Sequence, residues 1–185
     1  VVAADLDADV RRDLRSLSPD RAEQVAGHLV AAGVLIDEDP ALALEHARTA
    51  RALGARLALV REAVGLTAYA AGEYREAAAE LRAYRRMSGS PEHLAVLADC
   101  ERALKRPERA LQLAKDPAVE KLSQASKVEM QIVAAGARAD MGDPDGVVRA
   151  LSAAPLRSIS RDPWVARLRY AYADLLLSAG RPEEA

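Results

Sequence analysis

The sequence predicts an all-α chain built from antiparallel helix hairpins, and two observations lead to this fold class. Its 185 residues include 41 Ala and 22 Arg but no Phe and no Asn. Residues that favour helices therefore outnumber the β-branched and aromatic residues that favour strands. In addition, Pro and Gly gather in short joints between long segments whose apolar residues stand three and four apart.

The joints divide the chain into its elements. Proline is tolerated at the first position of a helix, and glycine suits the left-handed residue just past a helix end, so each joint ends one helix and opens the next. The clearest joints are Asp39-Pro40, Gly72-Glu73, Lys105-Arg106-Pro107, Gly142-Asp143-Pro144 and Gly180-Arg181-Pro182. In chain order, the predicted helices span 20–35, 40–53, 56–71, 74–87, 91–104, 107–115, 123–141, 144–153 and 162–179. Residues 1–18 form a further short helix in this interpretation, because four apolar residues share one helical face: Leu6, Val10, Leu14 and Leu17.

The joints also recur with a regular spacing. The residues that open the second helix of each successive pair are Pro40, Tyr74, Pro107, Pro144 and Pro182, at intervals of 34, 33, 37 and 38 residues. Small residues follow three positions later, at Ala43, Ala77, Ala110, Val147 and Ala185. They also precede the last four openers by nine positions, at Gly65, Ala98, Ala135 and Ala173. This pattern predicts a helical repeat whose helices cross closely at these positions.

A two-helix repeat of this length resembles the tetratricopeptide repeat. The best copy runs from Val64 to Tyr84, where the family's small, turn, aromatic, small and large positions are Gly65, Gly72, Tyr74, Ala77 and Leu81. Arg61 stands where the family has tryptophan, and Pro107, Pro144 and Pro182 replace the aromatic residue in other copies. The stretches 84–91 and 98–104 also look like an actinobacterial family of uncharacterised tetratricopeptide-repeat proteins.

The resemblance implies a right-handed superhelical solenoid of stacked hairpins. Residues 1–19 form an N-terminal segment in this interpretation. Residues 20–185 form a repeat domain of four hairpins plus the first helix of a fifth, truncated at the C-terminus. A helical bundle or another solenoid of similar period is the alternative.

In such a solenoid the first helix of each pair lines the concave face. The resemblance and the helical register place one set of polar and aromatic candidates there: Glu62, Tyr69, Asp99, Arg102, Tyr170 and Asp174, with Leu66 among their apolar neighbours and Glu23 on the first helix. This mildly acidic groove suits an extended or helical peptide that carries basic and apolar residues. The alternative is an ordinary solvated face, with the tyrosines serving only to pack helices.

A second candidate surface consists of Arg82, Arg85 and Arg86, next to small turn residues. Three guanidinium groups suit an anion or an acidic partner. The alternative is a solvated helix face whose arginines are neutralised by nearby glutamates.

Several classes of function are disfavoured. A formal net charge of −2 lacks the basic excess of a nucleic-acid binder. The longest uncharged apolar run, Leu29–Ile36, is too short to span a membrane. Neither a phosphate-binding loop nor a metal-ligand motif is present, and His28 and His46 are isolated in the sequence. Cys100 lies two helical turns from His93, so we expect a buried structural thiol rather than a nucleophile.

These observations predict a cytoplasmic, non-enzymatic interaction scaffold without a cofactor, which binds a protein segment or peptide in its groove. The alternative is a regulatory sensor module that binds a small peptide or metabolite and controls a further effector domain. A third possibility is self-association through solenoid ends that expose apolar residues of the last helix, such as Trp164, Leu168 and Leu175.

Overall fold

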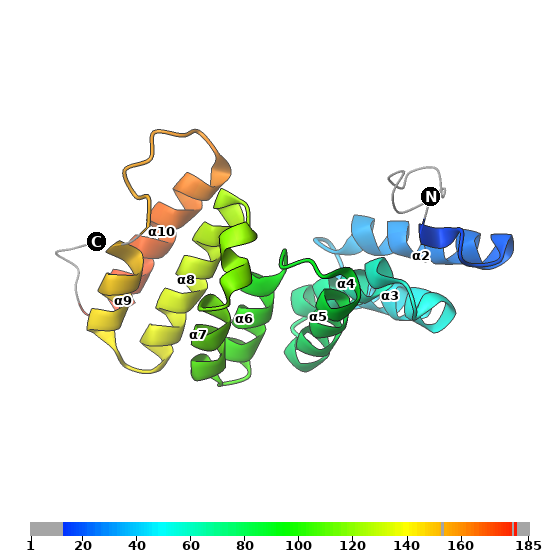
Figure 1. Cartoon of the computed structure of the whole chain (residues 1–185), viewed down its shortest axis with the longest axis horizontal. Coiled ribbons are helices and arrows are strands. Elements are labelled where there is room, and N and C mark those ends of the chain that lie inside the picture. Colours follow the sequence, from blue (N-terminus) through cyan, green and yellow to red (C-terminus); the bar gives the residue numbers. More distant parts are fainter. Residues whose placement is uncertain (1–12, 153, 179, 181–185) are drawn as a thin grey trace. The chain divides into compact units, whose positions relative to one another are not determined.

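A computed structural model describes residues 13–152, 154–178 and 180 of the chain. Its internal contacts divide the protein into two units, one ending at Ser90 and the other beginning at Pro91, and each is described by itself. Figure 1 labels the α-helices. The first unit contains α2 (Pro19–Leu35), α3 (Pro40–Gly54), α4 (Ala58–Ala70) and α5 (Tyr74–Ser88). The second contains α6 (Leu94–Ala103), α7 (Pro107–Ala114), the 3₁₀-helix η2 (Pro117–Lys121), α8 (Gln124–Asp140), α9 (Pro144–Ser152) and α10 (Pro163–Ser178).

The nine helices expected from the sequence between residues 20 and 179 all lie in the described part, close to their predicted ends. The largest difference is at α6, which begins at Leu94 rather than at residue 91. Pro91 opens a turn there, and its carbonyl accepts a hydrogen bond from the Leu94 amide at 3.0 Å. The helix η2 was not predicted. Most of the helix expected over residues 1–18 lies outside the described residues.

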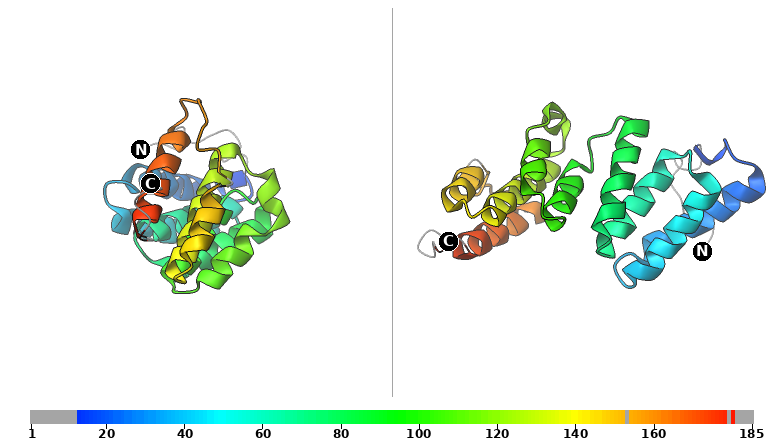
Figure 2. Two further views of the ribbon diagram at one scale, coloured as in Figure 1. Left: turned by 90° about the vertical axis from the view of Figure 1, so that its left-hand side faces the viewer. Right: turned by 90° about the horizontal axis from the view of Figure 1, so that it is seen from below.

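Helices that follow one another in the sequence pack as hairpins: α2 with α3, α4 with α5, α6 with α7, and α8 with α9. Figure 2 shows these pairs from two further directions. Within each unit, the helix that follows a hairpin packs on both helices of that hairpin: α4 on α2 and α3, α8 on α6 and α7, and α10 on α8 and α9. The prediction of sequential helix pairs is therefore confirmed, whereas a continuous superhelical solenoid stays a prediction.

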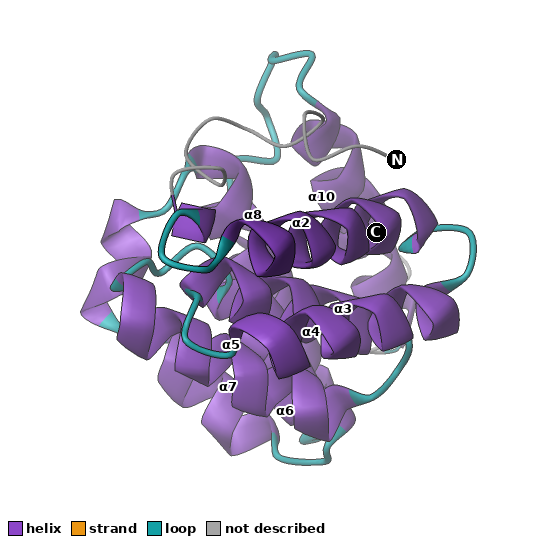
Figure 3. Cartoon of the chain, turned by 90° about the vertical axis from the view of Figure 1, so that its right-hand side faces the viewer, coloured by secondary structure: helices purple, strands orange, loops and turns teal. Residues whose placement is uncertain are grey.

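Every regular element in the described residues is a helix, and Figure 3 shows only helices and loops there. None of these helices has the length and apolar character needed to cross a membrane. The described residues are thus all-α, as the composition predicts.

Three of the joints have the same backbone geometry. The residue two positions before each opener has a positive φ: Gly72 at 77°, Lys105 at 60° and Gly142 at 68°. The next amide donates to the carbonyl five residues earlier, in the pairs Glu73 to Ala68, Arg106 to Glu101 and Asp143 to Arg138, at 2.8–3.0 Å. This is the Schellman motif, which satisfies carbonyls that the helix end leaves without partners. The repeated turns predicted from the sequence are thus real at the level of the backbone.

The small residues lie where the helices come close together. Ala43, Ala77, Ala98, Ala110 and Ala135 are fully buried. At Gly65 on α4, an added Cβ would lie only 2.6 Å from Cδ2 of Leu81 on α5. The predicted crossing at Gly65 is confirmed, because glycine alone leaves room for Leu81 there.

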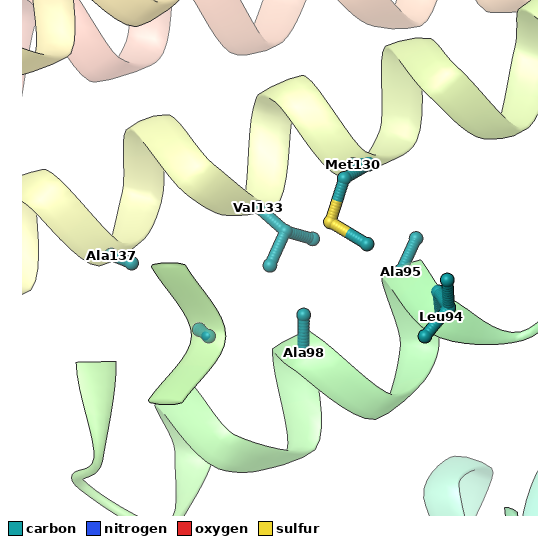
Figure 4. Close-up of a cluster of buried hydrophobic side chains, with 7 residues drawn as sticks. Leu94, Ala95, Ala98, Met130, Val133 and Ala137 are labelled. Carbon is teal, nitrogen blue, oxygen red and sulfur yellow. The ribbon is translucent and has the colours of Figure 1, made fainter. Parts of the chain in front are cut away.

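Each unit has its own apolar core. In the first unit, Leu14 packs in a cluster with Val25, Ala50 and Val60. In the second unit, side chains of α6 and α8 face each other, as Figure 4 shows for Met130 and Val133 above Ala95 and Ala98. Most of these side chains are small, so the helices approach closely and the fold gains its burial from many modest contacts.

Candidate functional site

The first unit has an apolar hollow between α2 and α4, the first helices of its two hairpins. Its volume is about 260 Å³. From α2 and its C-cap it is lined by Leu29, Ala32, Gly33 and Ile36, and from α4 by Leu59, Glu62, Ala63, Leu66 and Thr67. Eight of these nine residues are uncharged, so the hollow would favour an apolar group from outside.

Local sequence explains why the hollow is open and apolar. Gly33 has no side chain, and a Cβ built there would meet no atom within 4 Å, so this part of α2 borders open space. The Thr67 hydroxyl donates to the Ala63 carbonyl of its own helix at 2.7 Å, which satisfies its donor internally. Glu62 is the one charged residue in the lining.

Two residues predicted to face a groove, Glu62 and Leu66, therefore do line a hollow. Glu23, the α2 residue predicted for the same face, is exposed and absent from this lining, whereas Leu29, Gly33 and Ile36 take that place. The signal for these residues is the apolar run Leu29–Ile36, which is too short to span a membrane but supplies the apolar side chains of this hollow.

Tyr69 packs within the first unit. Its ring meets that of Tyr74 edge to face, with centroids 5.9 Å apart, and this contact joins the last turn of α4 to the start of α5. Both rings are half-buried. The contact supports the alternative interpretation that Tyr69 stabilises the hairpin.

Asp99 and Arg102 lie together in the second unit as an ion pair. Nη1 of Arg102 lies 3.0 Å from Oδ1 of Asp99, and its Nε lies 2.9 Å from Oδ2 of Asp140 on α8. The guanidinium rests against Gly136, where an added Cβ would come within 2.6 Å of it. Arg102 therefore ties α6 to α8.

The same arginine borders a polar hollow of about 440 Å³. Its lining carries both signs of charge and consists of Arg102, Lys105, Pro107, Glu108, Asp140 and Met141. Lys105 occupies the left-handed turn position between α6 and α7. This hollow is suited to a small ligand that carries both charges.

The other predicted groove residues, Tyr170 and Asp174, are exposed on α10, with Tyr170 77% accessible. The predicted groove set is thus divided between the two units: Glu62 and Tyr69 in the first, and Asp99, Arg102, Tyr170 and Asp174 in the second. The structure supports a hollow at Glu62 and an intrachain ion pair at Asp99 and Arg102.

The arginine surface lies on the second half of α5. Nη1 of Arg82 donates to the Ala78 carbonyl at 3.4 Å. Arg85 and Arg86 lie in the last turn, which Gly89 ends with a φ of 73°. Cations near a helix C-terminus interact favourably with the helix dipole, so this position gives both residues a structural role. Whether the patch binds an anion stays a prediction.

A cluster of ionic side chains that the sequence analysis did not predict joins α3, α4 and α5. The carboxylate of Glu80, which is only 7% exposed, forms ion pairs with two arginines: Oε1 lies 2.7 Å from Nη1 of Arg51, and Oε2 lies 2.8 Å from Nη1 of Arg61. Arg48 lies 2.5 Å from Glu76, and its hydrogen bond lowers the pKa of Glu76 below the usual value. Arg61, which stands at the family's tryptophan position, thus contributes a charge to a polar contact between helices.

His28 and His46, expected to be isolated, are in contact across the α2–α3 hairpin. Their Nδ1 atoms are 2.9 Å apart and their ring centroids 5.1 Å apart. Burial and the neighbouring His46 lower the pKa of His28 below its usual value. The expectation failed because the two residues meet only once the hairpin has formed. Cys100, in contrast, is buried as expected.

In comparisons with known proteins, no protein-family profile, curated protein or solved structure matches this chain. The resemblance to the tetratricopeptide repeat therefore rests on the residues quoted above.

Proposed function

We propose that this protein is a helical-repeat scaffold of the tetratricopeptide type, and that the hollow between α2 and α4 binds a segment of a partner protein. The observation that carries the proposal is the hollow itself: eight uncharged residues and Glu62, on the first helices of two stacked hairpins. A helix or extended segment could place aliphatic side chains there and a Lys or Arg near Glu62.

The repeat interpretation has further support in the spacing of contacts within the second unit. Arg102 on α6 contacts Asp140 on α8, and Glu129 on α8 contacts Arg167 on α10. Both pairs are 38 residues apart, which matches the intervals of 37 and 38 residues between the openers in this part of the chain. Equivalent first helices thus contact one another one repeat apart, as stacked hairpins require.

A selection from a library of random twelve-residue peptides tests the proposal. The wild-type chain is the target, and the selected peptides are measured by fluorescence anisotropy against Leu66→Glu and a matched control, Leu42→Glu. Leu42 is 40% exposed on α3 and does not line the hollow, so it controls for the added charge. Circular dichroism melts verify that both variants fold.

We expect the selected peptides to combine aliphatic residues with Lys or Arg. Their affinity should fall at least tenfold in Leu66→Glu and stay unchanged in Leu42→Glu. Glu62→Lys should weaken binding of basic peptides by like-charge repulsion. The proposal fails if no peptide is enriched, or if the peptides bind both leucine variants equally.

A second candidate function is the sensor module, favoured by the polar hollow at Arg102, Lys105 and Asp140. Its mixed charges suit a zwitterionic metabolite better than an aliphatic peptide side chain. A thermal-shift screen of amino acids and related zwitterions tests it, with Lys105→Ala as the variant that should lose any stabilisation. A screen without any stabilising compound would count against this function.

A further inference from the structure

The histidine pair is the strongest cluster of possible metal ligands within one unit of the described residues. His28 comes from the middle of α2 and His46 from the middle of α3, so two packed helices hold the rings. Both side chains are half-buried, which leaves solvent access on one side. The proposed peptide hollow involves other residues, so the pair needs an explanation of its own.

We propose that His28 and His46 bind one divalent transition-metal ion of the zinc class through their Nδ1 atoms, clamping α2 to α3. Two nitrogens bonded to one zinc at about 2.0–2.1 Å with a tetrahedral angle lie about 3.3–3.4 Å apart. The Nδ1 atoms are already 2.9 Å apart. Small ring rotations that separate them by about 0.4 Å would make room for the ion. Water takes the remaining coordination positions.

The protons balance in this step. In the neutral pair one Nδ1–H donates to the other Nδ1, so one ring carries its proton at Nδ1 and the other at Nε2. Metal binding needs a lone pair on both Nδ1 atoms. The donor ring therefore gives its Nδ1 proton to water and takes one from water at Nε2, with no net release of protons.

The electrostatic environment favours this exchange near neutral pH. Metal ions bind neutral imidazole, and a protonated ring competes with them. Burial and the neighbouring His46 hold the pKa of His28 below its usual value, which favours the neutral form of this ring.

Isothermal titration of the full chain with ZnCl₂ at pH 7.5 tests the proposal. The variants are His28→Gln and His46→Gln, which keep a polar side chain of similar size. His93→Gln, at the N-cap of α6 in the second unit, is the matched control because it removes the third histidine of the chain. We expect one zinc ion per chain, at least tenfold weaker binding in either variant of the pair, and no change in His93→Gln.

A second measurement does not depend on variants that must fold. In ¹⁵N spectra of the wild-type imidazoles, zinc should shift the Nδ1 signals of His28 and His46 and leave both rings protonated at Nε2. Wild-type protein that binds no zinc at millimolar concentration overturns the proposal. Equal binding by wild type and His28→Gln, or a zinc shift confined to His93, overturns it as well.

Discussion

The crossing of α4 and α5 at Gly65 makes a prediction that opposes simple helix propensity. Replacing a glycine inside a helix by alanine normally stabilises the protein by about 1 kcal/mol. At Gly65, however, the new Cβ would lie 2.6 Å from Cδ2 and 2.7 Å from Cγ of Leu81, with the Leu81 amide nitrogen at 3.3 Å. The side chain of Leu81 is almost fully buried and its backbone belongs to α5, so neither can move aside freely.

Overpacking of this kind costs about 1–3 kcal/mol. Gly65→Ala should therefore be destabilised by about 0–2 kcal/mol after the propensity gain of about 1 kcal/mol is subtracted. Gly27→Ala is the matched control, because a Cβ at Gly27 on α2 meets no atom within 4 Å. It should be stabilised by about 1 kcal/mol. The difference between the two changes in the free energy of unfolding is then the cost of placing a Cβ at the crossing itself.

Urea unfolding followed by far-ultraviolet circular dichroism measures both variants against the wild type. A double-mutant cycle with Leu81→Ala isolates the contact, because removal of the leucine side chain takes away most of the clash. Leu81→Ala should cost about 2–5 kcal/mol alone but less in the Gly65→Ala background. The larger Gly65→Leu should be destabilised more than Gly65→Ala. If Gly65→Ala and Gly27→Ala change stability equally, the close crossing does not exist in solution.

The remaining predictions concern turns and charges. Lys105→Gly should raise the free energy of unfolding by about 0.5–1 kcal/mol in urea titrations, because Lys105 has a φ of 60°, whereas Gly142→Ala, with a φ of 68°, should lower it by about 1 kcal/mol. Glu80→Gln should lower the free energy of unfolding by about 1–3 kcal/mol in thermal melts, because Arg51 and Arg61 would lose the charged carboxylate that they share. Glu120, which is exposed and pairs with Lys127, provides the comparison: Glu120→Gln should change the free energy of unfolding by less than about 0.5 kcal/mol. Because the pKa of His28 is lowered in the folded state, the folded chain binds fewer protons at His28 than the unfolded chain does. The contribution of His28 to the free energy of unfolding is therefore present above about pH 6.5 and is lost as the pH falls below it, and pH-dependent melts of His28→Gln should lack this loss.

The helices and turns could be predicted because their causes are local. A proline at the first position and a glycine at the C-terminal turn act through the backbone of adjacent residues, so Pro40, Gly72 and Gly142 mark the ends correctly. Lys105 shows that the turn is stronger than the residue preference, since the same turn forms there without glycine. The late start of α6 could not be predicted in this way, because Pro91 is compatible both with a first helical position and with the turn that it forms.

The contacts between side chains were harder to predict because they need the register of each hairpin. Glu80, for example, collects arginines from α3 and α4, and helical periodicity within one segment cannot reveal this convergence. The hollow likewise depends on the distance between α2 and α4, which belong to different hairpins. The resemblance and the helical register predicted a groove at Glu62 and Leu66, but not the α2 residues opposite them.

Part of this register can nevertheless be recovered from the turns. In an antiparallel hairpin, two residues at equal distances from the centre of the loop lie level with each other, because both helices rise by the same amount per residue. His28 and His46 are each nine residues from Asp37, and they touch. The α4–α5 loop is centred on Gly72, and Gly65 and Leu81, seven and nine residues from it, form the close crossing of α4 with α5. Once the repeated turns are placed, the sequence thus indicates to within about one residue which residues face each other within a hairpin, and the contact between His28 and His46 becomes a predictable feature of the α2–α3 hairpin.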